Sequence, residues 1–236
     1  AKLKENVRGE AASLPRKPGL AVILVGEDPA SRVYVTSKRK DCEECGFYSE
    51  EYALPAQTTQ KQLLELVAEL NGRADIDGIL VQLPLPKGLD EREVLLAIDP
   101  CKDVDCFHPY NVGQLTIGAP VFQPCTPGGV MEMLKEYRID PAGKRCVVLG
   151  RSNIVGKPMA LLLLHAHGTV VMCHSKTPDL KELAASADIL VSAVGKTGLV
   201  TADMVKEGAV VIDVAMNRSE EGKLCGDVCF EEAAVK

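Results

Sequence analysis

The feature that most constrains this chain is a regular alternation of short apolar runs with longer segments of helical periodicity. The alternation occurs twice, once before residue 99 and again from residue 144. Apolar runs separated by amphipathic helices are typical of βαβ units, in which parallel strands form a sheet that helices cover. The pattern therefore predicts an α/β protein with two domains and mostly parallel sheets.

Turn residues and apolar periodicity set the expected limits of each element. In the first half, strands are expected at 19–25, 48–54 and 78–83, and helices at 31–45, 59–70 and 90–98. In the second half, strands are expected at 146–149, 170–173, 189–194 and 209–214, and helices at 130–137, 157–167, 180–187 and 202–206. A polar segment at 217–223 indicates a hairpin loop.

The stretch 99–127 separates the two halves. It contains five prolines, several glycines and little periodicity. Such a composition is typical of active-site loops and of a hinge between domains. We therefore expect a catalytic domain at 1–125 and a Rossmann-type dinucleotide-binding domain at 126–236.

The composition excludes several classes of partner. The chain carries 27 basic and 33 acidic side chains, which gives a formal net charge of −6, and its longest basic run is residues 38–40. An acidic protein with no basic stripe is a poor binder of nucleic acid. No apolar stretch approaches the length that crosses a bilayer, so neither nucleic acid nor a membrane is an expected partner.

The nine cysteines are odd in number and scattered, several of them within apolar runs. This favours buried free thiols in a reducing cytoplasm over a disulfide framework. Cys42 with Cys45, and Cys225 with Cys229, have spacings found in zinc or redox sites but lack the flanking residues of such sites, so no metal is expected. The sequence begins at Ala1 instead of Met and shows no signal-peptide pattern. A cytoplasmic location is therefore expected, with organelle targeting left open.

A glycine-containing turn from Gly150 to Pro158 directly follows an expected strand and opens an expected helix. Gly150 and Gly156 let the backbone approach a pyrophosphate, and the helix N-terminus offers free N–H groups. The spacing differs from the standard dinucleotide fingerprint, and the alternative is an ordinary turn with two packing glycines. We favour a dinucleotide site because the turn lies between a strand and a helix.

The end of the next strand bears on the choice of cofactor. NAD sites usually place a carboxylate there to hold the ribose hydroxyls, but this strand continues into His174, Ser175 and Lys176. Arg151 and Ser175 are instead placed to meet a 2′-phosphate, which guanidinium and hydroxyl groups bind well. The pattern favours NADP over NAD, and the alternative is that Arg151 and Lys176 are simply solvated.

A second set of candidates lies in the first half. Tyr34 and Lys38 are one turn apart in an expected helix, and Gln82 ends an apolar strand just before a proline. A polar side chain at the carboxyl end of a parallel strand is where α/β proteins bind ligands, although a Gln satisfied at a strand end is an equal alternative. Asp103 and Asp105 lie in the turn-rich stretch. Without a third metal ligand, they favour binding of a substrate amine or amide over a metal site.

Ordered motifs then point to a family. The chain contains Tyr34-Val-x-x-Lys38, Val81-Gln-Leu-Pro-Leu-Pro86, Lys102-Asp-Val-Asp105, Pro124-Cys-Thr-Pro127, Gly150-Arg-Ser152, His174-Ser-Lys-Thr177 and Val211-Ile-Asp-Val214, in that order. One such motif is weak, but the ordered set is specific and spans essentially the whole chain. It resembles the bifunctional methylenetetrahydrofolate dehydrogenase/methenyltetrahydrofolate cyclohydrolase family.

The resemblance implies a homodimer whose chains each have a catalytic domain, an NADP domain and a folate cleft between them. It implies NADP-linked oxidation of 5,10-methylenetetrahydrofolate and hydrolysis of the methenyl product to 10-formyltetrahydrofolate, which are reactions of one-carbon metabolism and purine biosynthesis. The implied roles are acid/base chemistry for Lys38, orientation of the folate for Tyr34, tuning of Lys38 through a hydrogen bond for Gln82, and binding of the pterin for Asp105. The substrate site includes Val81 and Leu83, and the implied cofactor contacts are Gly150, Arg151, Ser152, Ser175 and Met216.

Elementary electrostatics agrees with the role of Lys38. A methenyl substrate is cationic, so a second positive charge beside it is unfavourable. The amine of Lys38 is therefore expected to give up its proton more readily and, once neutral, to assist the attack of water as a general base.

Three departures from the family pattern are expected to matter. Cys106 and Ala215 stand where the family usually has glycine, and a β-carbon at either position introduces strain if φ is positive. The family chain also has a first helix that is expected to be missing here, and it continues beyond Lys236 with a Gly/Pro-rich segment that helps to wall the folate site. Two alternatives stay open: a shikimate-type NADP dehydrogenase using Lys38 with Asp105, and a non-catalytic protein that binds nucleotides or a thiol-held metal.

Overall fold

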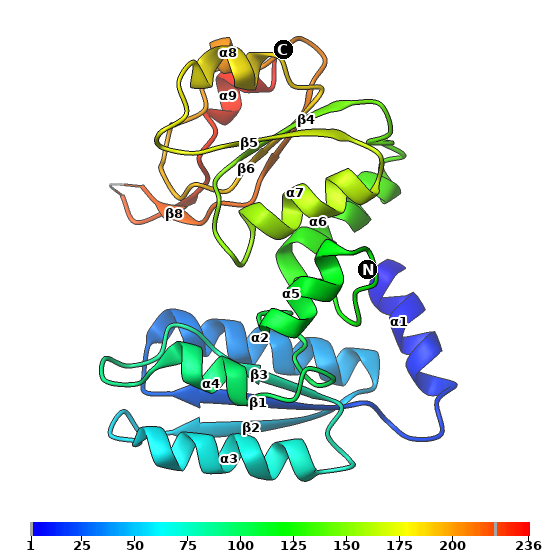
Figure 1. Ribbon diagram of the computed structural model, residues 1–236, viewed down its shortest axis with the longest axis vertical. Coiled ribbons are helices and arrows are strands. Elements are labelled where there is room, and N and C mark those ends of the chain that lie inside the picture. The colour runs from blue at the N-terminus through cyan, green and yellow to red at the C-terminus, as the bar shows by residue number, and fades with distance from the viewer. Residues whose placement is uncertain (1, 220) are drawn as a thin grey trace. The chain divides into compact units, whose positions relative to one another are not determined.

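The computed structural model describes residues 2–219 and 221–236, in two compact units that divide between Gly113 and Gln114. Each unit has its own parallel sheet covered by helices, which confirms the predicted α/β fold (Figure 1). The domain boundary expected at residue 125 lies later in the chain than this division.

The first unit is built around a three-stranded parallel sheet in the order β2-β1-β3. Its strands are β1 (Gly19–Val25), β2 (Tyr48–Leu54) and β3 (Gly78–Val81), and its helices are α1 (Lys2–Ala12), α2 (Pro29–Cys45), α3 (Gln60–Gly72) and α4 (Glu91–Ala97). In the register of the sheet, Leu20 of β1 is paired with Ser49 on one side and Gly78 on the other. Helix α5 (Pro109–Thr116) contains the division between the two units.

Strand β1 is apolar on both faces because successive side chains point to opposite sides of a sheet. Ala21 and Ile23 belong to a buried cluster with α3 and α4, whereas Val22 and Leu24 pack with Val35 of α2. Figure 1 accordingly shows α2 and α3 on opposite sides of this sheet. A central strand covered on both faces is the arrangement that a continuous apolar run predicts.

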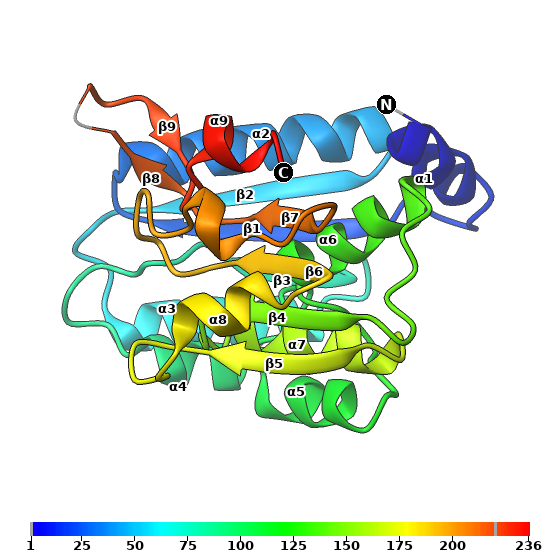
Figure 2. The same ribbon diagram turned by 90° about the horizontal axis from the view of Figure 1, so that it is seen from above.

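The second unit is built around a four-stranded parallel sheet in the order β5-β4-β6-β7, and the arrows of its strands point the same way in Figure 2. The strands are β4 (Arg145–Leu149), β5 (Thr169–Cys173), β6 (Ile189–Ser192) and β7 (Val210–Asp213). The helices are α6 (Cys125–Glu136), α7 (Gly156–His165), α8 (Leu180–Ala185), the short α9 (Phe230–Ala233) and the 3₁₀ turn η1 (Ala202–Met204). An antiparallel hairpin of β8 (Asn217–Arg218) and β9 (Leu224–Cys225) follows β7, as predicted.

The topology of this sheet creates a binding edge. Cys146 and Val148 of β4 pack with α6 and α7, and Val147 and Leu149 pack with α8 on the other face. The chain passes from β4 to β5 on one side and returns to β6 on the other side of β4. In such sheets ligands bind outside the carboxyl ends of the strands where the connections diverge, which here is between β4 and β6.

Several helices differ from the sequence-based expectation. Helices α1, α5 and α9 lie where none was predicted, and α6 begins at Cys125 instead of residue 130. The stretch 99–127 is therefore not all loop, and Pro109 opens α5 because its fixed φ suits the first helical position. Helix α7 ends at His165 instead of residue 167, since His167 has a left-handed φ of 62°. The helix expected at 202–206 is only the turn η1.

The cysteine side chains of the described residues are free thiols, and those at positions 42, 45, 106, 146 and 173 are buried. Burial raises the pKa of the Cys42 thiol, and that of Cys146 to about 11, which is opposite to the shift of a reactive thiolate. The described side chains include no group of three or more His, Cys, Asp or Glu placed to hold a metal ion. Within 2–219 and 221–236, no helix combines the length and the apolar character that a membrane span requires.

Candidate active site

The first unit brings two of the predicted residues into contact. Lys38 Nζ donates a hydrogen bond of 3.2 Å to Gln82 Oε1, and both side chains are partly buried. Gln82 Nε2 in turn donates to the carbonyl oxygen of Leu83 at 2.8 Å, which holds the amide with its oxygen toward the amine. The fold therefore pairs a helical amine with an amide 44 residues later in the chain.

Regular elements hold both partners. Lys38 lies in α2, whose start is capped by Asp28, which accepts a 2.7 Å hydrogen bond from the Ser31 N–H. Gln82 directly follows β3, and its N–H donates to the Ile23 oxygen at 2.9 Å. This bond continues the hydrogen-bond pattern between β3 and β1 for one residue beyond the end of β3. The side-chain amide of Gln82 therefore lies at the carboxyl end of the sheet.

Three further predicted residues of this site are close to Lys38 or Gln82 in the sequence. Tyr34 lies one turn before Lys38 in α2 and is 39% exposed. Val81 is buried as the last residue of β3, and Leu83 is partly buried after Gln82. Gln82 is thus a polar side chain set between two apolar ones at a strand end.

The charged residues of the segment Lys102 to Asp105 differ in their surroundings. Lys102 Nζ donates to three carbonyl oxygens at the end of α3, at 2.7–3.1 Å. Asp103 is 1% exposed, and its Oδ2 accepts from His108 N at 2.8 Å and Asn111 Nδ2 at 2.9 Å, which holds the start of α5. Lys102 and Asp103 therefore have structural roles that spacing did not reveal, and Asp105 lies partly buried beside them.

The two positions where glycine was expected behave differently. Cys106 is buried with a left-handed φ of 59°, so its β-carbon is held in a conformation that favours glycine. Ala215 does not have a positive φ, so the expected strain is absent there. Only the first of these two departures therefore carries a backbone cost.

The glycine turn of the second unit requires its glycines. Gly150 has φ 113°, and a β-carbon there would lie 2.4 Å from the Ala193 oxygen. A β-carbon on Gly156 would lie 2.3 Å from the Gly150 oxygen. Ser152 Oγ accepts from the N–H groups of Val155 and Gly156, both at 3.2 Å, and so satisfies donors at the start of α7. The turn is thus packed so closely that a β-carbon fits at neither glycine.

The predicted phosphate-binding side chains lie at the ends of neighbouring strands. Leu149 is paired with Cys173 in the register of β4 and β5, and Arg151 and Ser175 each follow two residues later. Both side chains are exposed, as are Ser152 and Met216. Hydrogen bonds between His174 and Thr177 close a turn around Ser175, with His174 N donating to Thr177 Oγ1 at 2.9 Å. The register therefore places Arg151 and Ser175 at equivalent positions beyond the ends of two neighbouring strands.

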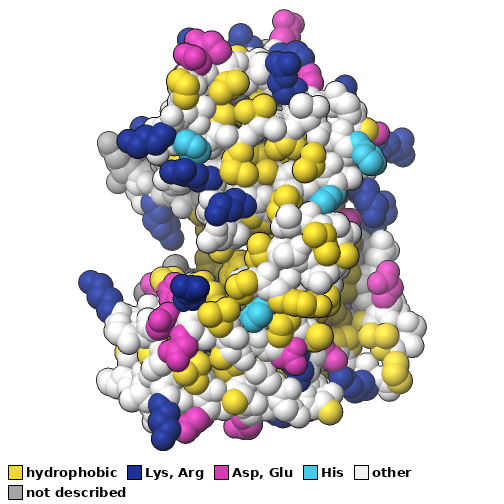
Figure 3. All heavy atoms as spheres, in the orientation of Figure 1, with side chains coloured by type: hydrophobic (Ala, Val, Ile, Leu, Met, Phe, Trp, Pro, Cys, Tyr) yellow, Lys and Arg dark blue, Asp and Glu magenta, His cyan; other side chains and the backbone are white. Residues whose placement is uncertain are grey.

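Basic side chains gather on one part of the second unit's surface. Figure 3 shows Lys and Arg side chains gathered over the edge of this unit where the hairpin β8–β9 lies in Figure 1. Phosphate groups are bound by such cations through charge-assisted hydrogen bonds. A pocket of about 530 Å³ lies near β7, β9 and α9, and none of the predicted site residues lines it.

Sequence reasoning missed Asp227, which is completely buried and accepts hydrogen bonds from the loop that follows β6. The only signal in the sequence was an Asp between Gly226 and Val228. That signal is too weak to distinguish a buried carboxylate from a turn residue.

Both units are similar to known protein domains. Residues 1–105 match the model of the tetrahydrofolate dehydrogenase/cyclohydrolase catalytic domain, and residues 124–236 match that of the family's NAD(P)-binding domain. The chain belongs to the tetrahydrofolate dehydrogenase/cyclohydrolase family.

Individual members of the family are similar over most of their length. The bifunctional protein FolD of Magnetococcus marinus is 60% identical over 221 residues, which are 92% of this chain and 78% of that protein. The bifunctional FolD methylenetetrahydrofolate dehydrogenase/cyclohydrolase of Campylobacter jejuni is 50% identical, with a TM-score of 0.96 over 100% of this chain and 85% of that one. The Trypanosoma brucei enzyme, solved with NADP and an inhibitor, is 41% identical, with a TM-score of 0.92 over 98% of this chain and 83% of that one.

Family membership confirms the predicted enzyme, with its dehydrogenase and cyclohydrolase activities on tetrahydrofolate derivatives. It favours this function over the shikimate-type alternative. The predicted dinucleotide cofactor is confirmed by the NAD(P)-binding model on the second unit. The roles of the individual site residues stay predictions.

Proposed function

We propose that this chain oxidises 5,10-methylenetetrahydrofolate to the methenyl compound with NADP and hydrolyses that product to 10-formyltetrahydrofolate in one-carbon metabolism. Family membership supports the reaction pair. The hydrogen bond between Lys38 and Gln82 is the observation that supports the residue assignment, because it joins the predicted base to its predicted partner at the ligand-binding edge of a parallel sheet.

Lys38 is the proton-transfer group in this proposal. The amide of Gln82 orients the amine through its oxygen without adding a carboxylate that would stabilise the ammonium form. In its neutral form this amine can accept a proton from the water that attacks the cationic methenyl group. The side chain of Lys38 is partly buried, which keeps the amine at the site.

Binding of the folate falls to the neighbouring side chains. Asp105 accepts hydrogen bonds from pterin N–H groups, which suits an ionised carboxylate because it only accepts. Tyr34 contributes an accessible ring one turn from Lys38 on α2, a shape that suits a flat conjugated ligand. Val81 and Leu83 supply the apolar surroundings of Gln82.

The second unit holds NADP in this proposal, and its residues fit that cofactor. The β-carbon-free turn at Gly150 leaves backbone for the pyrophosphate, and Ser152 lies at the start of α7. Arg151 and Ser175 bind the 2′-phosphate from adjacent strand ends, and Met216 covers the cofactor with an exposed apolar side chain. When bound, NADP supplies the hydride acceptor, and the protein contributes alignment.

A homodimer in the cytoplasm completes the proposal. Within the described residues, β2 is an end strand of the first sheet and has an edge available for pairing. Nine free thiols, five of them buried, suit a reducing compartment. Sedimentation of the purified chain tests the dimer, which a single species with the mass of one chain would contradict.

A coupled assay tests the two reactions together. NADPH formation and methenyl absorbance are followed on one preparation given methylenetetrahydrofolate and NADP. We expect NADPH to appear with a transient methenyl signal that decays by hydrolysis. Turnover with NAD alone would contradict the cofactor, and a methenyl signal that decays no faster than in buffer would contradict the cyclohydrolase.

A further inference from the structure

Asp227 is a fully buried carboxylate surrounded by hydrogen-bond donors. Its accessible fraction is 0%. Oδ2 accepts from Ser192 Oγ at 2.8 Å, from Val194 N at 2.9 Å and from Gly195 N at 3.3 Å. Oδ1 accepts from Lys196 N at 2.6 Å and from Asn217 Nδ2 at 3.0 Å.

These donors select the ionised form of the side chain. Burial is the largest single influence on this carboxyl and acts to raise its pKa. The hydrogen bonds from Val194, Ser192, Asn217 and Lys196 together outweigh burial, so the pKa of Asp227 lies below its usual range. An asparagine of the same shape would turn an N–H₂ group toward N–H groups and break part of the network.

The loop that Asp227 holds lies at the binding edge of the second sheet. Val194, Gly195 and Lys196 follow β6, which is the neighbour of β4 across the point where the connections diverge. Ala193 N donates to the Leu149 oxygen at 2.8 Å, and Gly150 packs directly against the Ala193 oxygen. The loop is therefore one wall of the glycine turn that approaches the dinucleotide.

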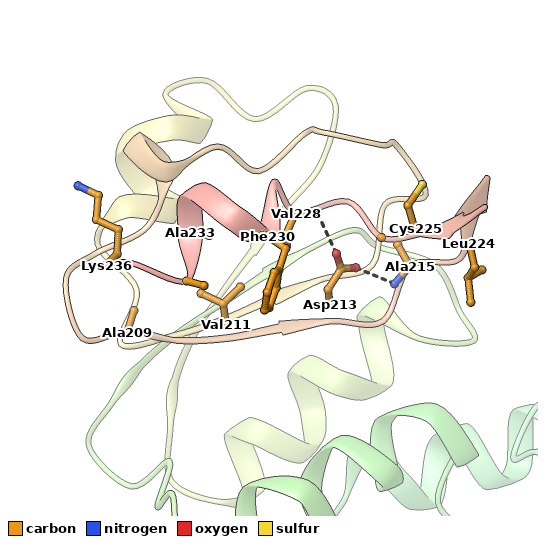
Figure 4. Close-up of a pocket in the computed structure, with 12 residues that line it drawn as sticks. Ala209, Val211, Asp213, Ala215, Leu224, Cys225, Val228, Phe230, Ala233 and Lys236 are labelled. Atoms are coloured by element: carbon orange, nitrogen blue, oxygen red, sulfur yellow. Dashed lines mark hydrogen bonds between the residues drawn. The ribbon is translucent and has the colours of Figure 1, made fainter. Parts of the chain in front are cut away.

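A second carboxylate anchors the segment that carries Asp227. Asp213, at the end of β7, accepts from Ala215 N at 3.0 Å and from Val228 N at 2.8 Å, as Figure 4 shows. A β-carbon on Gly226 would lie 2.0 Å from Asp213 Oδ2, so the segment fits only with glycine there. Met216, a predicted cofactor contact, lies between Ala215, held by Asp213, and Asn217, held by Asp227.

We propose that Asp227 is a positioning residue for the dinucleotide, because it joins the loop after β6 to the segment that carries Met216. The inference rests on the proposed NADP-dependent function. Asp227 itself is buried beneath the loop and does not touch the cofactor. It acts by fixing the backbone of Val194, Gly195 and Lys196 and the side chain of Asn217.

The test compares two activities of one protein. Asp227→Asn is expected to raise the KM for NADP at least about tenfold, because small displacements of positioning groups have effects of that size or larger. Hydrolysis of methenyltetrahydrofolate needs no NADP and is expected to stay within about twofold of wild type, since its residues lie in the first unit. An unchanged KM for NADP, or an equal loss of both activities, would overturn the proposal.

Asp188→Asn is the matched control. Asp188 also accepts from a backbone N–H, that of Arg145 at 2.8 Å, but it precedes β6 at the amino ends of the strands. We expect it to lower stability without moving the KM for NADP. A rise equal to that of Asp227→Asn would show a general effect of weakening the unit and would overturn the positioning role.

A milder variant keeps the test decisive if Asp227→Asn does not fold. Asn217→Ala removes one hydrogen bond from the network and is expected to raise the KM for NADP about threefold with hydrolysis unchanged. No rise would overturn the proposal. Failure of the proposed function is distinguishable, because then wild-type protein would neither form NADPH nor hydrolyse the methenyl substrate.

Discussion

The two units make their candidate sites from different materials. In the first unit, side chains on regular elements meet across the sheet edge, as when Lys38 of α2 reaches Gln82 after β3. In the second unit, close backbone packing shapes the turn on which the candidate side chains lie. Gly150 and Gly156 pack against carbonyl oxygens, and Asp227 accepts hydrogen bonds from the N–H groups of the loop after β6. A side-chain site can lose its chemistry while its scaffold stays intact, whereas a backbone site loses binding when its packing changes.

Because of this difference, we expect the two units to tolerate different substitutions. Truncating Lys38 removes an amine from a partly buried helix position and leaves α2 and its cap in place. Adding a methyl group at Gly150 pushes the turn into the Ala193 oxygen and so moves the sheet edge itself. Mutations in the first unit should therefore separate catalysis from stability more cleanly than mutations in the second.

The largest effect is expected at Lys38. Lys38→Met keeps the apolar stem but removes the base, and general acid–base catalysis typically contributes about 10²–10⁴-fold, so hydrolysis of the methenyl compound should fall by that factor. Lys38→Arg should fare as badly, because a guanidinium stays charged. The measurement is methenyl hydrolysis beside NADPH formation on one preparation.

Lys40→Met is the matched control for this prediction. Lys40 lies in the same helix, has a 75% exposed side chain and forms a long ion pair of 3.9 Å with Glu44. Its loss should leave hydrolysis near the wild-type rate. If Lys38→Met also hydrolyses at that rate, the assigned base is wrong.

A smaller loss, roughly 100-fold in folate affinity, is expected for Asp105→Asn, since the amide turns a donor toward pterin N–H groups. NADP binding should be unchanged. Asp103→Asn sharpens the comparison, because Asp103 holds His108 N and Asn111 and should instead lower thermal stability. Titrations with folate and NADP and a melting curve distinguish the two variants. Wild-type activity that a chelator abolishes and a divalent metal restores would favour a metal site at Asp105.

In the second unit, Arg151→Ala tests the choice of cofactor. Hydrogen bonds to a charged group contribute about 1.5–3 kcal/mol, so affinity for NADP should fall about 10- to 100-fold while affinity for NAD changes little. Arg145→Ala, at the exposed amino end of β4, is the control and should affect neither. An equal weakening of both cofactors would remove Arg151 from the 2′-phosphate.

Sequence predicted the parts of both sites that depend on local pattern. Strands 19–25 and 48–54 were predicted to the residue. The first is an apolar run that begins at a glycine and is followed by another, and the second is followed directly by a proline, so turn residues mark where both strands end. Gln82 as the partner of Lys38 was implied only by the resemblance to the family, since 44 residues separate the two in the chain.

Asp227 was missed because four of its hydrogen-bond donors lie 31–35 residues away in the chain, and no sequence periodicity indicates such a network. Helix α5 was missed because its opening proline was one of several in the stretch 99–127.

The smallest effect concerns the two positions where glycine was expected, one in each unit. Cys106 has φ 59°, and a left-handed conformation costs a residue with a β-carbon about 1–2 kcal/mol, so Cys106→Gly should be more stable than Cys106→Ala by about 1 kcal/mol. Ala215 has no positive φ, so Ala215→Gly should lower stability by about 0.4–1 kcal/mol through the added freedom of the unfolded chain. Urea unfolding of the three variants measures both differences. If Cys106→Ala is as stable as Cys106→Gly or more stable, then packing around the buried thiol, and not backbone strain, determines the stability at this position. The contrast between the two units would then rest on their candidate sites alone.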